Sequence, residues 1–237
     1  MGRAHEVRKA AMAKTAAAKT KVYSKYGKEI LIAAKAGVPD PEMNLSLKRI
    51  IEKAKKDQVP SDIIKRAIDK AKSGAGEDYS PVTYEGFGPG ASTIIIECLT
   101  DNVNRTVSDV KTCFNKSHAK MGVNGCVSHS YQHVSLLSLK GMSEEEVLDA
   151  LMEANVDVLN IEEDEGEILL TGSDTDLYNM KTALERPGVE FDIEKISWET
   201  DEKVTLEGEE LELFERLLTN LDGCDDVQEV YHNVELD

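Results

Sequence analysis

The stretch VTYEGFGPGASTIIIEC, residues 82–98, marks the point at which the chain changes from helix to sheet. β-branched and aromatic residues stand at both ends of it, and a run of Gly and Pro stands in the middle. The first kind of residue favours extended backbone, while Gly and Pro favour a turn. We therefore expect two strands, at 82–84 and 93–98, that begin a sheet.

Downstream of this hairpin, helical and extended patterns alternate. Val107, Val110 and Phe114 recur at helical spacing within residues 102–117, and residues 127–139 then alternate as one or two strands of the same sheet. The remaining expected elements are a helix around 147–151, strands at 156–161 and 168–170, a helix at 177–184, a strand at 189–198, a helix at 209–221 and a strand at 227–234. An acidic hairpin turn, residues 162–166, separates the two strands in the middle of this region.

Upstream of the hairpin the pattern is helical throughout. Helices are expected over residues 3–19, 22–36, 41–59 and 61–73, with Asp40 and Ser61 as the caps of the last two. The first is rich in Ala and Lys and has few large apolar residues, so it can form but buries little. Residues 73–78, SGAGED, have the composition of a linker.

These patterns predict an α+β multidomain protein. Residues 1–75 form a basic N-terminal helical bundle, and two α+β domains follow it. One helix and one strand are too little for a domain of their own, so residues 201–237 are expected to complete the domain begun at 79–140. Residues 141–200 would then be an α+β domain inserted into the middle one.

The formal net charge of −17 is unevenly distributed. Residues 1–75 hold 18 Lys and Arg against 8 Asp and Glu, whereas the rest of the chain holds 10 against 37. Exposed charges are screened over about 8 Å at physiological salt, so a distant acidic domain does not cancel a basic one. The first 75 residues can therefore attract a polyanion that the rest of the chain repels.

The sequence favours a cytoplasmic protein that does not enter a membrane. Its first residues lack the apolar stretch of a signal peptide, and no later run approaches the roughly 20 apolar residues that span a bilayer. Cys98, Cys113, Cys126 and Cys224 lie far apart without a C-x-x-C pair. We expect them to be reduced and to form no disulfide.

Basic residues of the bundle are the candidate nucleic-acid ligands. They are Arg3, Arg8, Lys9, Lys14, Lys19, Lys21, Lys25, Lys28, Lys48, Arg49, Lys53 and Lys56, with Lys55 beside them. Several recur at i, i+4 or i+7, which aligns them on helix faces that could follow a phosphate backbone. The alternative is the solvated charged face that any soluble helix carries.

Two further runs are candidate sites for a phosphate or another anion. The loop Tyr84, Glu85, Gly86, Phe87, Gly88, Pro89, Gly90 resembles the Gly-rich loops that hold a phosphate, but it lacks the Gly-Lys-Ser/Thr ending of a P-loop. The alternative is a structural turn that uses Gly where φ must be positive. The run Asn102, Val103, Asn104, Arg105, Thr106 opens a helix, where Asn104 could cap it or the turn could hold an anion.

A metal site is not expected. Cys126, His129 and His133 are ligand types for zinc, but in an extended strand the first two point to opposite faces and the two histidines lie about 13 Å apart. The acidic runs 162–166 and 222–226 lack the Asp spacing of a calcium loop and are predicted to be solvated hairpin tips. No nucleophile with a neighbouring base is visible, so we expect no enzyme and no cofactor.

Taken in order, four runs make the whole chain resemble the YebC/PmpR family of probable transcriptional regulatory proteins. They are MGRAHEVRK at 1–9, PDPEMN at 39–44, the loop at 84–89 and TDNVNRT at 100–106. The resemblance implies three domains with the last inserted into the middle one, and a cytoplasmic, non-enzymatic regulator described as DNA-binding. Some members are similar to ribosome-associated translation factors, among them a mitochondrial translational activator of cytochrome oxidase. Two departures stand out: no Trp lies near the start, and His118-Ala119 replace a common Gly-Gly.

Three functions follow as hypotheses. The first is a DNA-binding transcriptional regulator whose basic bundle contacts phosphates. The second is a ribosome-associated factor that binds ribosomal RNA, because RNA and DNA backbones present the same charge. The third is a protein-interaction module in which the acidic domains bind a basic partner without nucleic acid.

Overall fold

The computed structural model describes residues 16–236, with side chains from residue 21 onward. Its helices are α2 (Ala16–Ala36), α3 (Leu45–Lys56), α4 (Ser61–Lys72), α5 (Val103–Lys116), α6 (Glu144–Glu153), α7 (Leu177–Leu184) and α8 (Gly208–Asp222), with a short 3-10 helix η1 (Ser128–Ser130). Its strands are β1 (Ser80–Phe87), β2 (Thr93–Thr100), β3 (Lys120–Met121), β4 (Gln132–Lys140), β5 (Asn160–Asp164), β6 (Glu167–Ser173), β7 (Glu190–Glu199) and β8 (Val227–His232). This part of the chain is a mixed α and β fold with two antiparallel sheets.

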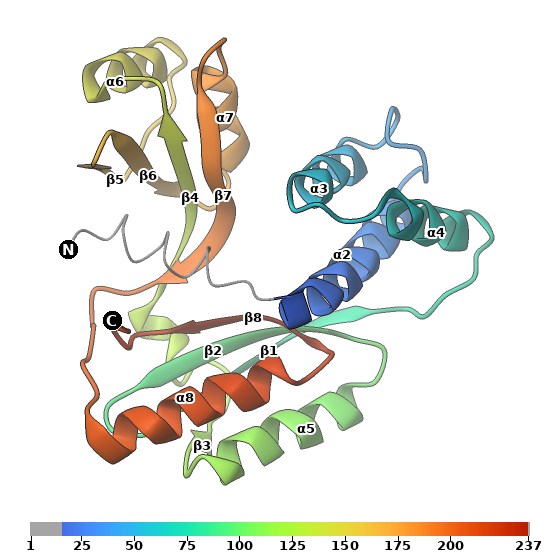
Figure 1. Ribbon diagram of the computed structural model, residues 1–237, viewed down its shortest axis with the longest axis vertical. Helices are drawn as coiled ribbons and strands as arrows, with labels where there is room; N and C mark the ends of the chain where they lie inside the picture. The colour runs from blue at the N-terminus through green and yellow to red at the C-terminus, as the bar shows by residue number, and fades with distance from the viewer. Residues whose placement is uncertain (1–15, 237) are drawn as a thin grey trace.

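Helices α2, α3 and α4 form a small bundle (Figure 1). Ile30, Leu47 and Ile64 are buried at its centre, since apolar residues three to four positions apart give each helix one inward stripe. The hydroxyl of Tyr26 on α2 donates to Asp57 at 2.5 Å, which ties the first helix to the end of the second.

Three predictions about helix ends were wrong. Helix α2 runs without a break through Val22 from Ala16, so the predicted boundary there does not exist. Helix α3 begins at Leu45 with Asn44 as its N-cap, because residues 40–43 form a turn in which the Met43 N–H bonds the Asp40 carbonyl. In α4, Pro60 is the N-cap residue and Ser61 is already helical, with no side-chain cap.

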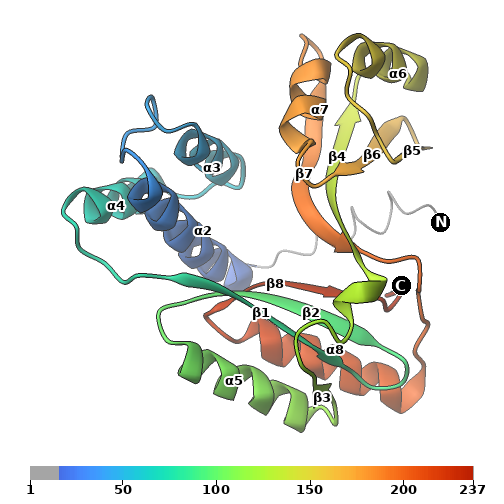
Figure 2. The same ribbon diagram turned by 180° about the vertical axis from the view of Figure 1, so that it is seen from behind.

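The first sheet, sheet A, has the strand order β3-β1-β2-β8. Helices α5 and α8 cover one of its faces (Figures 1 and 2). Phe114 of α5 and Phe214 of α8 are fully buried there against Ile94 and Ile96 of β2. The hairpin of β1 and β2 predicted around residues 82–98 is confirmed, with Tyr84 opposite Ile96.

The second sheet, sheet B, has the order β5-β6-β4-β7, with α6 and α7 packed on one face. The prediction that residues 127–139 belong to the first sheet is wrong, because β4 pairs with β6 and β7 in sheet B. Residues 134–139 are buried on both faces of the strand, as a central strand requires. A period-2 pattern shows that a segment is a strand but does not identify its partners.

The chain leaves sheet A after β3, builds sheet B, and returns to sheet A with β8, which pairs with β2. The bundle and sheet B both rise from the side of sheet A opposite α5 and α8 (Figure 2). Tyr131 and Trp198 pack with Ile95 where the two sheets meet. None of the described helices combines the length and apolar character needed to cross a bilayer.

Candidate nucleic-acid interface

Three of the predicted phosphate ligands on α2 face the body of the protein. Lys21 forms an ion pair of 2.8 Å with Asp222 at the end of α8. Lys25 donates to the backbone carbonyl of Gln228 in β8, and its burial lowers its pKa. These lysines attach the bundle to sheet A.

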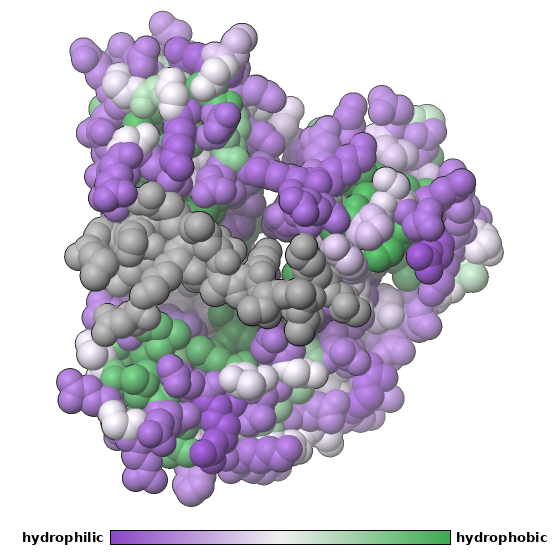
Figure 3. All heavy atoms as spheres, viewed as in Figure 1, coloured by the Kyte–Doolittle hydropathy of each residue, from purple (hydrophilic) through white to green (hydrophobic). Residues whose placement is uncertain are grey.

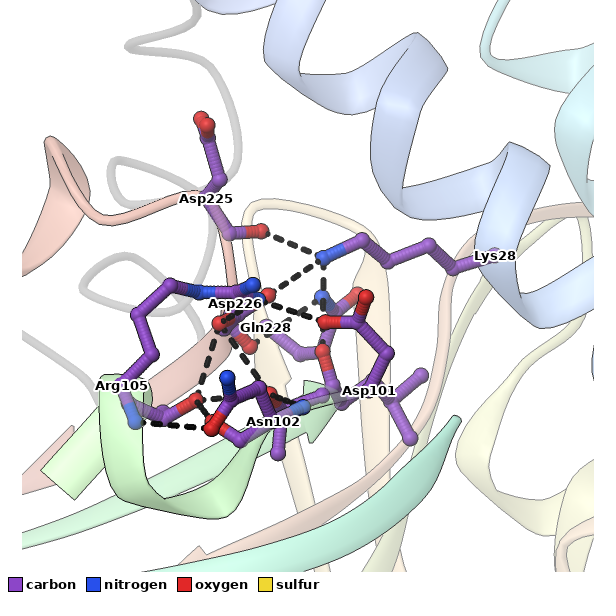
Figure 4. A network of polar contacts seen from close by, with 10 residues as sticks. Lys28, Asp101, Asn102, Arg105, Asp225, Asp226 and Gln228 are labelled. Atoms are coloured by element: carbon purple, nitrogen blue, oxygen red, sulfur yellow. Dashed lines mark hydrogen bonds and ion pairs between the residues drawn. The ribbon is translucent and has the colours of Figure 1, made fainter. Parts of the chain in front are cut away.

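Lys28 is the most strongly held of the three. Its Nζ lies 3.0 Å from the carboxylate of Asp226, 2.8 Å from the carbonyl of Asp225 and 3.3 Å from that of Leu99 (Figure 4). Its side chain is only 11% exposed. Lys28 is therefore a structural cation within the protein and is not available to a phosphate.

The TDNVNRT motif contacts the carboxylate of Asp226, which also binds Lys28. Arg105 Nη2 lies 2.7 Å from Asp226 and 2.7 Å from Asp101, and the Thr106 hydroxyl lies 2.9 Å from Asp226. Burial alone would raise the pKa of Asp226, but hydrogen bonds from Arg105 and Lys28 lower it to about 2. The motif thus takes part in a network of ion pairs that connects α2, the start of α5 and the residue before β8 (Figure 4).

The prediction of a solvated tip at 222–226 was wrong for its last residue. Asp226 is buried, and its backbone carbonyl accepts the Leu99 N–H of β2. Residues 222–226 include three aspartates, and such a run is typical of an exposed turn. The burial depends on cations 121 and 198 positions away, and no local pattern reports them.

The cap of α5 is Asn102. Its side-chain oxygen accepts the Arg105 N–H at 3.1 Å, whereas Asn104, which we proposed as the cap, lies within the first turn and is exposed. Asn102 in turn is positioned by a hydrogen bond from its own N–H to the Thr100 hydroxyl. Capping and the ion pairs account for this motif without an anion ligand.

Glu85 gives the 84–89 motif a structural role. Its carboxylate is buried and accepts the N–H groups of Gly125, Val127 and Ser128 at 2.7–2.9 Å. Burial alone would raise its pKa, but these backbone donors lower it. The motif therefore holds the loop that precedes η1.

The glycine of this motif is required for space. A Cβ at Gly86 would lie 2.5 Å from the Phe114 ring and 2.7 Å from the Lys120 carbonyl. The expected turn with a glycine at positive φ is confirmed, and that glycine is Gly90, whose φ is 63°. Phe87 is the last residue of β1, and Pro89 lies in the turn between β1 and β2.

Cys126 and His129 lie on the loop that Glu85 holds, and residues 128–130 are helical where we expected a strand. His133 Nδ1 lies 2.9 Å from Asp174, and its ring packs against Trp198 with centroids 4.6 Å apart. No three His, Cys, Asp or Glu side chains among residues 16–236 form a group that could hold a metal ion.

The exposed cations of the bundle lie on α3 and α4. These helices carry nine Lys and Arg against three Asp and Glu. We call outer cations the exposed ones for which the described residues supply no ion pair: Lys53, Lys55, Lys65, Arg66, Lys70 and Lys72. Of these, only Lys53 was among the predicted ligands.

The other predicted ligands of α3 have partners. Lys48 lies 3.6 Å from Glu42, and Arg49 lies over the ring of Tyr178 on α7, 3.7 Å from its centroid. Lys56 donates to the carbonyl of Phe191 in β7. Arg3, Arg8, Lys9, Lys14 and the side chain of Lys19 lie outside the part of the chain that is described.

Comparison with known proteins identifies relatives of this chain. One family model, the TACO1/YebC protein N-terminal domain, matches residues 3–74, and another, the TACO1/YebC second and third domain, matches residues 79–234. The chain belongs to the TACO1/YebC family. The resemblance drawn from the four sequence runs is therefore confirmed.

TACO1/YebC relatives match the chain over nearly its whole length. A "probable transcriptional regulatory protein" of Alteromonas mediterranea is 52% identical over 98% of both chains. Another with the same name, from Pseudoalteromonas atlantica, is 53% identical over 98% of this chain and 97% of its own. The crystal structure of a conserved hypothetical protein from Aquifex aeolicus is 34% identical, covers 94% of this chain and 93% of its own, and superposes with a TM-score of 0.78.

Proposed function

We propose that this TACO1/YebC chain is a cytoplasmic, non-enzymatic regulator of gene expression that binds nucleic acid through the outer cations of α3 and α4. The proposal rests on one observation: cations of α2 are used in contacts within the protein, whereas those of α3 and α4 include a set that is exposed. Lys21 and Lys28 of α2 form ion pairs at the junction with sheet A, whereas the outer cations are exposed and without ion pairs among the described residues. The name of the relatives, transcriptional regulatory protein, supports a regulatory output.

Phosphate contact is the chemistry that these side chains offer. Lys and Arg on two adjacent helices can neutralise several backbone phosphates and release their counterions, which gives affinity without sequence preference. The same contacts can be made to DNA or to ribosomal RNA. We place DNA first because of the relatives' name, and keep ribosome binding as the alternative.

The acidic parts of the chain complete the proposal. We propose that residues 132–200, which contain sheet B, are a domain inserted into the one that contains sheet A. This segment holds 18 Asp and Glu against 4 Lys and Arg. Such a charge repels phosphate, so it restricts nucleic acid to the bundle and leaves sheet B free to contact a basic protein partner.

A charge-reversal pair tests the proposal. Lys53, Lys55, Lys65 and Lys72 are changed together to Glu, and binding of duplex DNA, structured RNA and ribosomes is measured across a salt series. We expect a loss of at least about tenfold and a shallower dependence of the binding constant on salt, because phosphate contacts set that slope. The matched control changes Lys111, Lys116, Lys120 and Lys203, which alters the net charge equally.

The outcomes separate the hypotheses. Selective loss of duplex DNA binding supports transcription, and selective loss of ribosome binding supports the translation alternative. Equal losses in the two variants would show that only net charge matters. Absence of any binding by the unaltered protein at low salt would leave the protein-interaction module as the remaining function.

A further inference from the structure

A cavity opens beside the outer cations, between α2, α4 and the segment that leads into β1. Its volume is about 280 Å³, close to the lower end of the range for small-ligand pockets. Gly27 on α2 and Ile63 on α4 form part of its apolar lining, and Tyr79 and Glu77 line it from the segment before β1. Its lining residues come from three separate stretches of the chain.

Two of the outer cations line this cavity. Arg66 and Lys70 are one helical turn apart on α4, so both project from the same side of the helix. The Nε of Arg66 donates to the Asp62 carbonyl at 3.2 Å, which steadies the side chain and leaves the terminal guanidinium nitrogens for another acceptor. The cavity thus has a positive rim with donors suited to phosphate.

Tyr79 supplies an aromatic surface in the same cavity. Its side chain is half-buried, and the Lys28 Nζ lies 5.1 Å from the centroid of its ring. Because Lys28 is fixed by Asp226, it helps to hold the ring in place. An aromatic ring, an apolar floor and a cationic rim are the three parts from which proteins build sites for unpaired bases.

We propose that this cavity binds one unpaired nucleotide of a single-stranded nucleic acid, with the base against Tyr79 and the phosphate on Arg66 and Lys70. The proposal rests on the proposed function, since the outer cations would deliver the strand. Glu77, the one carboxylate among the described residues of the lining, can accept a hydrogen bond from an exocyclic amino group of a base. A base stacked inside a duplex cannot reach such a site.

Figure 3 shows hydrophilic residues predominating around the bundle on the face drawn, so a strand bound to this face would meet a polar surface. On this arrangement the neighbouring nucleotides contact lysines such as Lys53 and Lys65 and contribute affinity, while the cavity adds the preference for an unpaired base. A free mononucleotide has only the cavity contacts and should bind weakly.

The test fills the cavity without changing any charge. A Cβ at Gly27 would lie 3.9 Å from Ile63, an ordinary contact, so Gly27→Ala is a matched control and Gly27→Leu extends the side chain into the cavity. A second pair removes or keeps the ring, with Tyr79→Ala and Tyr79→Phe. Binding is measured by fluorescence anisotropy to labelled 12-mers of deoxythymidine and of uridine, to a 20-base-pair DNA duplex and to AMP, and thermal unfolding checks each fold.

We expect Gly27→Leu and Tyr79→Ala to weaken binding of the 12-mers at least about fivefold, as loss of one base–aromatic contact does, and to leave duplex binding unchanged. The two controls should bind like the unaltered protein. Unchanged 12-mer binding by folded Gly27→Leu and Tyr79→Ala would overturn this inference alone. If the unaltered protein binds neither strand nor duplex, the proposed function fails as well, and tight binding of AMP would instead make the cavity a small-molecule site.

Discussion

At the scale of single residues, Asp226 has the largest structural role that we find. Its side chain is 8% exposed and lies within hydrogen-bonding distance of Lys28, Arg105 and Thr106, which come from two different helices. With Asp101, which also pairs with Arg105, the network has two cations and two carboxylates, so it carries no net charge. Removal of the carboxylate would leave Lys28, itself 11% exposed, without its counter-charge.

Asp226→Asn should lower the free energy of unfolding by about 3 kcal/mol at neutral pH, the cost of breaking a buried ion pair from one side. Urea unfolding measures the loss, and Asp225→Asn is the control because that side chain is exposed. The folded pKa of Asp226, about 2, lies below its unfolded value of about 3.9. Its contribution is therefore full above pH 4 and declines toward pH 2, so the difference between the two proteins should shrink over that range. An equal effect of both variants would contradict the assignment.

At the scale of elements, the turn between α2 and α3 is organised by one side chain. The Asn44 side-chain oxygen accepts the Leu47 N–H at 3.0 Å and so caps α3. Its amide nitrogen donates to the carbonyls of Ala33 and Val38, at 2.9 and 3.0 Å, and so fixes the end of α2. The PDPEMN run ends at this residue, which gives the motif a structural role in orienting two helices.

Asn44→Ala should therefore cost more than an ordinary cap, about 2 kcal/mol, because it removes both the cap and the two amide donors. Asn44→Asp keeps the accepting oxygen and removes only the donors, so its cost should be smaller. Thermal and urea unfolding of the two variants give the comparison. Equal losses would show that the cap contributes nothing beyond the interhelical hydrogen bonds.

The elements also show what the sequence could and could not predict. The bundle, the β1–β2 hairpin and α5 follow from local periodicity, and the predicted apolar positions Ile30, Val110 and Phe114 are buried. The partners of β4 and the burial of Asp226 were missed, because both depend on residues far away in the chain. The site was predicted only in outline: positive charge lies on the bundle, but periodicity could not tell the lysines of α2 that face sheet A from the outer cations.

At the scale of the whole molecule, the bundle touches both of the acidic parts. Its contact with sheet A is extensive and partly buried, through Lys21, Lys25 and Lys28. Its contact with the sheet B part is slight and exposed, through Arg49 over Tyr178 and Lys56 at the Phe191 carbonyl. Exposed polar contacts of this kind stabilise by less than about 1 kcal/mol and weaken with salt.

Arg49→Ala combined with Lys56→Ala should release the bundle from the sheet B part while leaving the unfolding temperature almost unchanged. Small-angle X-ray scattering should then show a larger radius of gyration than for the unaltered protein. The control, Lys53→Ala with Lys55→Ala, removes two charges from the same helix without touching this contact. A radius that is the same in all three proteins would mean that the contact does not determine the arrangement.

The return of β8 to sheet A has a consequence for how the molecule is made. Synthesis proceeds from the N-terminus, so β2 is complete long before its partner at 227–232 exists, and its edge along Ile94–Cys98 stays open while sheet B is being translated. Lys28 and Arg105 likewise lack their shared carboxylate until residue 226 has left the ribosome. During synthesis the cationic helices are therefore still undocked, and the nascent protein presents lysines that the finished one conceals.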